Sequence, residues 1–155
     1  MSQSPTVRAF FEQDHDRLDG LFASFQTLMR SDPDKAQVAF NEFKAGLERH
    51  IVWEEDLLFP LWERKTGMTH SGPTVVMRSE HRQIHQLLDR IHAALSATKP
   101  ESDEMEQALV DILTSHNMKE ERVLYPAIDQ TISDEERAAV FRAMNETQAG
   151  RTVQG

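Results

Sequence analysis

The chain has 155 residues, a length that fits a single domain with one core. Its 17 Lys and Arg residues against 26 Asp and Glu residues give a net charge of −9, which disfavours binding to nucleic acid or to anionic lipid. Cysteine is absent, which excludes disulfides, thiolate metal sites, iron–sulfur clusters and thiol nucleophiles. Any metal must therefore be held by nitrogen and oxygen.

The N-terminal sequence MSQSPTVRAFFEQDHD lacks the basic start and apolar run of a signal peptide. No stretch of the chain approaches 18 uninterrupted apolar residues, the minimum for a membrane span. We therefore expect a soluble, cytoplasmic protein with no membrane partner, either a monomer or a small homo-oligomer.

Apolar residues recur at spacings of three and four along the first half of the chain, which predicts helices. The first helix is expected over residues 6–30 and stops at SDPD, residues 31–34. The second is expected over residues 35–59, where Pro60 should kink or end it because proline lacks a backbone donor. Glycines and a proline then predict a loop over residues 66–73.

The second half repeats this pattern. A third helix is expected over residues 74–97, and a fourth from about Asp103 to Pro126. Four long amphipathic helices joined by short turns predict an all-α protein, an antiparallel up-down-up-down four-helix bundle over about residues 6–130.

The C-terminal region predicts one more element. Ser133 and Glu136 have the spacing of a capping box, which indicates a short fifth helix at about residues 134–146. Residues 147–155 are expected to be a flexible tail. The whole chain, residues 1–155, is thus predicted to be a single domain.

One sequence pattern occurs twice. HIVWEEDLLFP begins at His50 and HNMKEERVLYP at His116, 66 residues later, and His15 and His81 are separated by the same offset. In antiparallel helices, residues equidistant from the intervening turn lie at the same height. Positions 15 and 50 are equidistant from the first turn, and positions 81 and 116 from the second, so all four histidines are expected at one level, roughly 25 Å from the turns.

Residues four apart share a helix face, which adds three more side chains to this level. If these faces point inward, seven side chains converge: His15, His50, Glu54, His81, His85, His116 and Glu120. Burying so many ionisable groups without partners would cost several kcal/mol per charge. A dinuclear metal centre resolves this, because carboxylates can bridge two cations while imidazoles fill terminal positions, and iron suits a mixed nitrogen and oxygen set. Room remains for a bridging oxygen and an open position.

These residues resemble the hemerythrin-like, or HHE cation-binding, domain in its bacterial form, over about residues 6–130. The resemblance implies two iron ions with a bridging oxo or hydroxo group in a four-helix bundle. It places His81, His85 and His116 on one iron and His15 and His50 on the other. Glu54 and Glu120 are the implied bridges.

Other polar residues near the repeat have more ordinary interpretations. His92 lies about 10 Å along the helix from His85 and is expected to be a hydrogen-bonded histidine, and His70 a solvated loop residue. Glu55 and Glu121 follow the ligand face by five residues, about 140° away from it, and are expected to face solvent. Side chains one turn from the ligands are candidates for the pocket wall or for hydrogen bonds to ligands: Asp19, Trp53, Phe11, Phe22, Leu47, Ile112 and Leu113.

The predicted site suggests a ligand-binding protein rather than an enzyme, and no catalytic residues stand out. The leading hypothesis is binding of O2, or of a related ligand such as NO or peroxide, for sensing, storage or delivery. An alternative is the handling of iron or of nitrosative and oxidative stress, because GPTVVMRSEH at residues 72–81 resembles a segment of di-iron proteins that repair iron–sulfur centres. A weak peroxidase-like or catalase-like activity is a third hypothesis.

Overall fold

In the computed structural model of the protein, the backbone is described for residues 5–97 and 101–154, and side chains to residue 147. Every regular element within these residues is a helix. The first half contains α1 (Val7–Ser31), α2 (Pro33–Val52), η1 (Trp53–Leu58) and α3 (Phe59–Thr66). The second half contains α4 (Pro73–Leu95), α5 (Asp103–Lys119), η2 (Glu120–Leu124), α6 (Tyr125–Thr131) and α7 (Asp134–Gln154).

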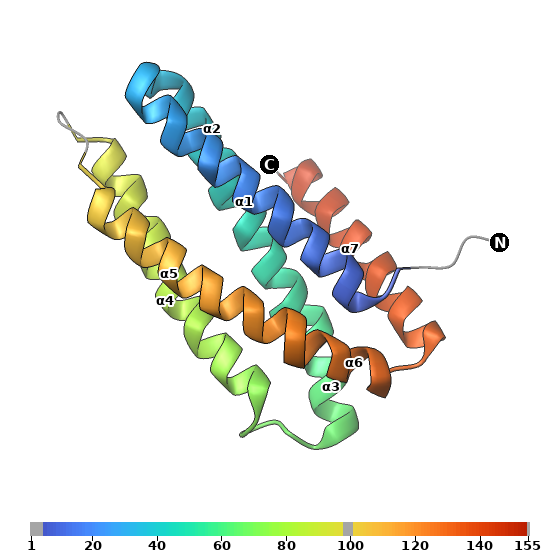
Figure 1. The fold of residues 1–155 in the computed structure, drawn as a ribbon. Helices are drawn as coiled ribbons and strands as arrows, with labels where there is room; N and C mark the ends of the chain where they lie inside the picture. The colour runs from blue at the N-terminus through green and yellow to red at the C-terminus, as the bar shows by residue number, and fades with distance from the viewer. Residues whose placement is uncertain (1–4, 98–100, 155) are drawn as a thin grey trace.

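The elements form four antiparallel rods with one helix packed outside them (Figure 1). The rods are α1, the continuous run of α2, η1 and α3, then α4, and the continuous run of α5, η2 and α6. α1 packs mainly on α2, and α4 on α5, while α7 lies beside the first pair. The predicted all-α antiparallel bundle is confirmed. No helix in the described part of the chain is both long and apolar enough to cross a membrane.

Capping residues fix the start of the first helix pair. Thr6 accepts a hydrogen bond from the Ala9 amide at the N-terminus of α1, as a good N-cap does. The carboxylate of Asp129 in α6 accepts from the Val7 and Arg8 amides, 2.8 and 3.1 Å away. This contact joins the end of the last rod to the beginning of the first, and it places a negative charge at the positive end of α1.

Neither proline of the repeat ends its helix, although we expected Pro60 to kink or end the second one. Each is preceded by a π-helical turn, where the Phe59 amide bonds to the Glu54 carbonyl and the Tyr125 amide to the Glu120 carbonyl, five residues back. The wider turn changes the hydrogen-bonding register just before a residue that has no amide hydrogen to donate. The rods therefore continue to Thr66 and Thr131.

The core is divided into two apolar clusters. One fills the bundle toward the α1–α2 turn and includes Phe25, Phe40 and Leu88. The other lies among η1, α3, α6 and α7 and includes Trp53 and Tyr125. Most of the buried polar side chains belong to neither cluster and come from the repeated histidine and glutamate positions.

The C-terminal helix is longer than the sequence suggested. α7 starts at the predicted capping box, where the Ser133 amide bonds to Glu136 and the Glu136 amide to Ser133. It then continues to Gln154, so the expected flexible tail over residues 147–155 is helical through residue 154. Gln, Ala and Arg in this stretch are adequate helix formers, and a single glycine costs only about 1 kcal/mol.

Candidate metal centre

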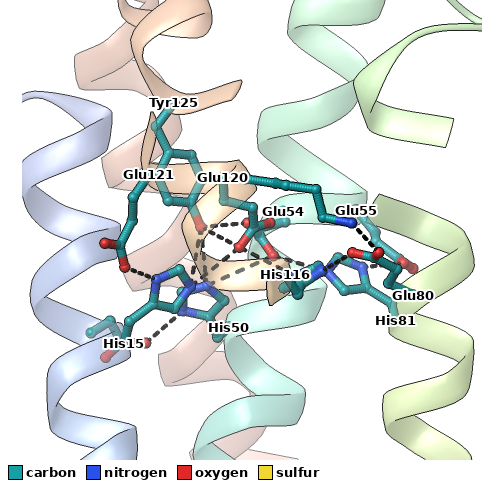
Figure 2. A network of polar contacts seen from close by, with 12 residues as sticks. His15, His50, Glu54, Glu55, Glu80, His81, His116, Glu120, Glu121 and Tyr125 are labelled. Atoms are coloured by element: carbon teal, nitrogen blue, oxygen red, sulfur yellow. Dashed lines mark hydrogen bonds and ion pairs between the residues drawn. The ribbon is translucent and has the colours of Figure 1, made fainter. Parts of the chain in front are cut away.

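Six polar side chains meet at one level of the bundle, all at most 3% exposed: His15, His50, Glu54, His81, His116 and Glu120. They come from α1, from the α2–η1 run, from α4 and from the α5–η2 run, so each rod contributes at least one (Figure 2). Their ligand atoms form two groups, within each of which all atoms lie within 4.8 Å of one another. One group contains Glu54, His81, His116 and Glu120, and the other contains His15, His50 and Glu120. Glu120 belongs to both groups, which is the position of a bridging ligand.

Two of the four imidazoles are held by an acidic residue that comes directly before a ligand histidine. The Nδ1 atom of His50 lies 2.8 Å from Oδ2 of Asp14, and Nδ1 of His116 lies 2.8 Å from Oε1 of Glu80. Asp14 and Glu80 are themselves 66 residues apart. The repeat therefore reproduces a contact between rods as well as the ligands.

The other two imidazoles are held by the second Glu of each doublet. Nδ1 of His81 lies 2.7 Å from Oε2 of Glu55, and Nδ1 of His15 lies 2.7 Å from Oε2 of Glu121. Since a carboxylate accepts a hydrogen bond from Nδ1–H, the lone pair of each neutral ring is on Nε2, which is the other ring nitrogen. Such carboxylate–histidine pairs fix the ring orientation and raise the basicity of a metal ligand.

The carboxylates strongly perturb the titration of His15 and His81. Burial disfavours the charged form of His15, but hydrogen bonding and charge attraction to Glu120 outweigh it and raise the pKa of His15 to about 9. Burial acts in the same way on His81, while Glu54 and Glu55 raise the pKa of His81 to about 10. In the absence of metal, protons thus balance the negative charge of the centre, and a divalent cation would displace them.

The two buried carboxylates are in unequal states. Burial and repulsion by Glu120 raise the pKa of Glu54. Burial also opposes ionisation of Glu120, but the charge of His116 holds the pKa of Glu120 well below its usual range. Glu120, the residue shared by both groups, is therefore the more firmly ionised of the two.

Several inward-facing atoms have no hydrogen-bond partner. Oε1 of Glu54, Nε2 of His81 and Oε2 of Glu120 are buried and unsatisfied, although the first two are only 3.1 Å apart. Buried polar atoms are normally paired, so three unpaired atoms in one layer indicate that a binding partner belongs there. A metal cation supplies one, because imidazole nitrogen and carboxylate oxygen are its usual ligands. The residues present fit a metal centre.

A tyrosine completes the polar layer. The Tyr125 hydroxyl donates to Glu54 at 2.7 Å or to Glu120 at 2.9 Å, and it lies 3.4 Å from Nε2 of both His15 and His50. Burial and the charge of Glu120 raise the pKa of Tyr125 well above its usual value, so the phenol keeps its proton. Its oxygen is a further potential metal ligand, as tyrosine oxygen is for haem iron in some enzymes.

The family model described as hemerythrin HHE cation binding domain matches residues 6–148. The chain belongs to this family. As the name of the family indicates, this hemerythrin-like protein is a metal-binding protein, and its His and Glu cluster is the place where the metal would be held.

Two relatives illustrate the range of proteins that carry similar sequence. The chain is 29% identical over 134 residues to a DNA nickase of Nostoc sp., a match that covers 86% of this chain and 36% of the nickase. It is 34% identical over 89 residues to the iron-sulfur cluster repair protein YtfE of Salmonella paratyphi B, covering 52% of this chain and 40% of that protein. The matches thus cover less than half the length of either relative. No solved structure matches the chain.

His85 is the one predicted ligand that the structure does not bring to the centre. Its side chain is 41% exposed, and its Nδ1 atom lies 3.9 Å from a Glu48 oxygen. Glu54 lies four residues beyond His50 in the direction away from the turns, whereas His85 lies four residues beyond His81 in the direction toward them. Four residues rise about 6 Å along a helix, so the carboxylates and His85 are on opposite sides of the histidine layer. Tyr125, on the carboxylate side, provides an oxygen there instead.

The predicted wall residues are distributed over three places. Phe11 contacts the ring of His50, with centroids 5.0 Å apart. Asp19, Phe22 and Leu113 line a cavity of about 500 Å³ between α1 and α5. The other three pack in the two apolar clusters: Trp53, Leu47 and Ile112.

Among the other histidines, His92 stacks on Phe40 with centroids 6.5 Å apart, away from the centre. His70 is exposed in the loop between α3 and α4. Glu55 and Glu121 do not simply face solvent as we expected, because each carboxylate contacts a histidine of a neighbouring rod. The π-helical turn explains this, since it shifts these residues from the 140° offset that a regular α-helix would give.

Sequence analysis also missed the roles of Asp14, Glu80 and Tyr125. The signal for the first two was present, because they obey the 66-residue offset and flank His15 and His81. Tyr125 aligns with Phe59 in the repeat, and no role was predicted for it. The available indication was its hydroxyl group, which stands at a position where the repeat otherwise predicts a buried apolar residue.

Proposed function

We propose that this chain is a non-haem di-iron protein that binds O2, or a related ligand such as NO or peroxide, for sensing, storage or delivery. The observation that carries the proposal is the arrangement of six buried ligand residues in two groups that share Glu120. Two iron ions bridged by a carboxylate and an oxo or hydroxo group would satisfy the unpaired atoms of Glu54, His81 and Glu120.

The balance of ligands supports binding over oxidation. The candidate centre contains four histidines and two glutamates, whereas the di-iron oxidases of the ferritin-like fold use four glutamates and two histidines. Fewer carboxylates leave less negative charge to stabilise highly oxidised iron. Iron held here would supply a reversible change of oxidation state and an open position for a small ligand.

The surrounding residues determine how such a ligand would be held. Each imidazole is fixed by a carboxylate at Nδ1, so the donor atoms are oriented before metal binds. The Tyr125 hydroxyl supplies one proton inside the layer, and Phe11 and Phe59 cover the imidazoles of His50 and His81 with apolar rings. The apolar cover limits access of water and protons to the centre, which favours release of an unchanged ligand.

The test is spectroscopic. The iron-loaded protein is reduced without oxygen, and O2 is then admitted and removed in cycles while the optical spectrum is recorded. We expect an absorption band that appears with O2 and disappears when O2 is removed. Direct and irreversible conversion to the diferric form would contradict O2 binding, and the same experiment with NO then tests the second ligand.

A second candidate function is the handling of iron for damaged iron–sulfur centres, which is supported by the similarity to the repair protein YtfE. The discriminating experiment mixes the iron-loaded protein with an apo iron–sulfur protein and follows formation of the cluster. A carrier or sensor is expected to retain its iron, while a repair protein transfers it. DNA is not proposed as a partner, because the net charge of −9 opposes contact with phosphates.

A further inference from the structure

The four carboxylates that hold the histidines are not equally shielded. Asp14 is bonded to Arg17 at 2.9 Å, and Glu80 forms an ion pair with Lys119. These two carboxylates are thus neutralised by a cation on the same or the neighbouring rod.

Glu55 lies beside an arginine that is held in place by several contacts. Arg78 bonds to the Glu55 carbonyl at 3.3 Å and to Glu63 at 3.1 Å, and its guanidinium lies over the ring of Phe59. The charge of Arg78 is one cause of the lowered pKa of Glu55. This end of the centre is therefore bordered by an arginine whose charge is paired with Glu63.

Neither Glu55 nor Glu121 makes a salt bridge to a lysine or arginine in the residues that the structure describes, and their side chains are 30% and 22% exposed. In the repeat, the position of Arg78 is occupied by Glu12, which pairs with Arg8 at the surface. The arginine beside Glu55 thus has no counterpart at the matching position of the repeat.

Glu121 lines the cavity of about 500 Å³ between α1 and α5. Two further carboxylates, Asp16 and Asp19, line the same cavity and make no ion pair within the described chain, while Arg122 is its one lining cation. Its apolar lining includes Phe22, Phe43 and Leu113. The wall therefore carries an excess of two negative charges.

The cavity borders the ligand layer at Glu121. Glu121 forms both the cavity wall and the 2.7 Å contact with Nδ1 of His15. Asp19 lies one helical turn from His15, and burial raises the pKa of Asp19 while the charge of His15 partly offsets the effect. The carboxylates of the wall therefore lie close enough to the centre to interact with its charge.

We propose that the cavity between α1 and α5 is the entrance through which divalent metal ions reach the His15–His50 end of the centre. The inference rests on the proposed metal-binding function. A cleft lined by one sign of charge concentrates counter-ions and raises association rates by factors of 10 to 1,000, and the effect falls with ionic strength.

The test measures how fast Co²⁺ enters the metal-free full-length protein. The variant is Asp16→Asn with Asp19→Asn, which removes two charges from the wall and retains nearly the same side-chain size. The matched control is Glu42→Gln with Glu146→Gln, which removes two charges from exposed positions outside the cavity. Uptake is followed by the visible absorption of bound Co²⁺, and the final ratio of metal to protein is determined separately.

At low salt we expect the Asn variant to load at least about tenfold more slowly than the wild type, with the same final metal content. In about 1 M NaCl, where charges act over only about 3 Å, the two rates should converge. The control should load like the wild type at both salt concentrations. A second variant, Ala23→Trp, fills the cavity and should slow loading at both.

Unchanged rates of Co²⁺ loading in both the Asn variant and Ala23→Trp would contradict the proposed entrance. Equal slowing of the control variant and the Asn variant would also contradict it. A reduced final metal content in the Asn variant would also overturn it, because Asp16 or Asp19 would then be holding metal. A wild-type protein that takes up no Co²⁺ would overturn the metal-centre proposal together with the entrance.

Discussion

The His15–His50 end and the His81–His116 end of the centre are built from the same pattern but have different surroundings. Both ends hold each imidazole through a carboxylate at Nδ1, with distances of 2.7 to 2.8 Å throughout. Near His15 stands the phenol of Tyr125, whereas near His81 stands the apolar ring of Phe59, stacked with centroids 6.0 Å apart. The repeat thus preserves the contacts that orient ligands, while the groups that set polarity and access have diverged.

The largest expected effect tests the sharing of Glu120 between the two ends. Glu120→Ala removes a ligand from both groups and should leave little bound metal, whereas Glu54→Ala removes a ligand from the His81–His116 group and should retain about one ion per chain. Elemental analysis of both variants, loaded with the same excess of Fe²⁺, measures this difference. Equal losses in the two variants would show that the ends are not independent.

Removal of metal should destabilise both ends together. A ligand present at 100 to 1,000 times its dissociation constant stabilises the folded state by about 3 to 4 kcal/mol. For a chain of this size that corresponds to roughly 10 °C in melting temperature. Melting curves with and without a chelator, followed by circular dichroism, test this expectation. Identical curves would contradict a metal that couples the rods.

Tyr125→Phe makes the two ends more alike and should have a moderate effect. Loss of the hydroxyl leaves the buried carboxylates of Glu54 and Glu120 with one donor fewer, which costs about 1 to 3 kcal/mol. The loss should be larger in the metal-free protein, since metal satisfies the same oxygens. Melting both forms of the variant and of the wild type checks this, and a larger loss in the metal-bound form would point to direct coordination by Tyr125.

The pH dependence of stability should differ between metal-free and metal-bound protein, by a smaller amount. The pKa of His15 is about 9 and that of His81 about 10, both above the unfolded value near 6.5. The stabilisation that these two histidines give the metal-free protein is fully present below about pH 6.5 and is lost as pH rises through 9 to 10. The metal-free protein should therefore have a lower melting temperature at pH 9 than at pH 7. Metal replaces these protons, so the metal-bound protein should show no such decrease between pH 7 and pH 9, and a parallel decrease in both forms would contradict this account.

The bundle and most of the ligand layer could be predicted from sequence because both follow from regular helix geometry. Equal distances from the turns place His15, His50, His81 and His116 at one height, and their convergence is what the structure contains. The prediction for His85 assumed that any residue on the ligand face reaches the centre. Position along the helix axis, and not only the face, determines which side chains can meet.

The contacts of Glu55 and Glu121 could not be predicted in the same way. Their direction depends on the π-helical turns before Pro60 and Pro126, which break the 100° periodicity on which the sequence argument relied. The role of Tyr125 depends on the same turns, because residues five apart face one direction there. Glu120 and Tyr125 are five apart and are joined by a hydrogen bond.

The most direct test of the central claim is the number of iron ions per chain in protein purified without added metal and then saturated with Fe²⁺ in the absence of oxygen. Two groups of ligands that share Glu120 predict two ions per chain, with half of them lost in Glu54→Ala. A ratio of one or less in the saturated wild-type protein would contradict a dinuclear centre.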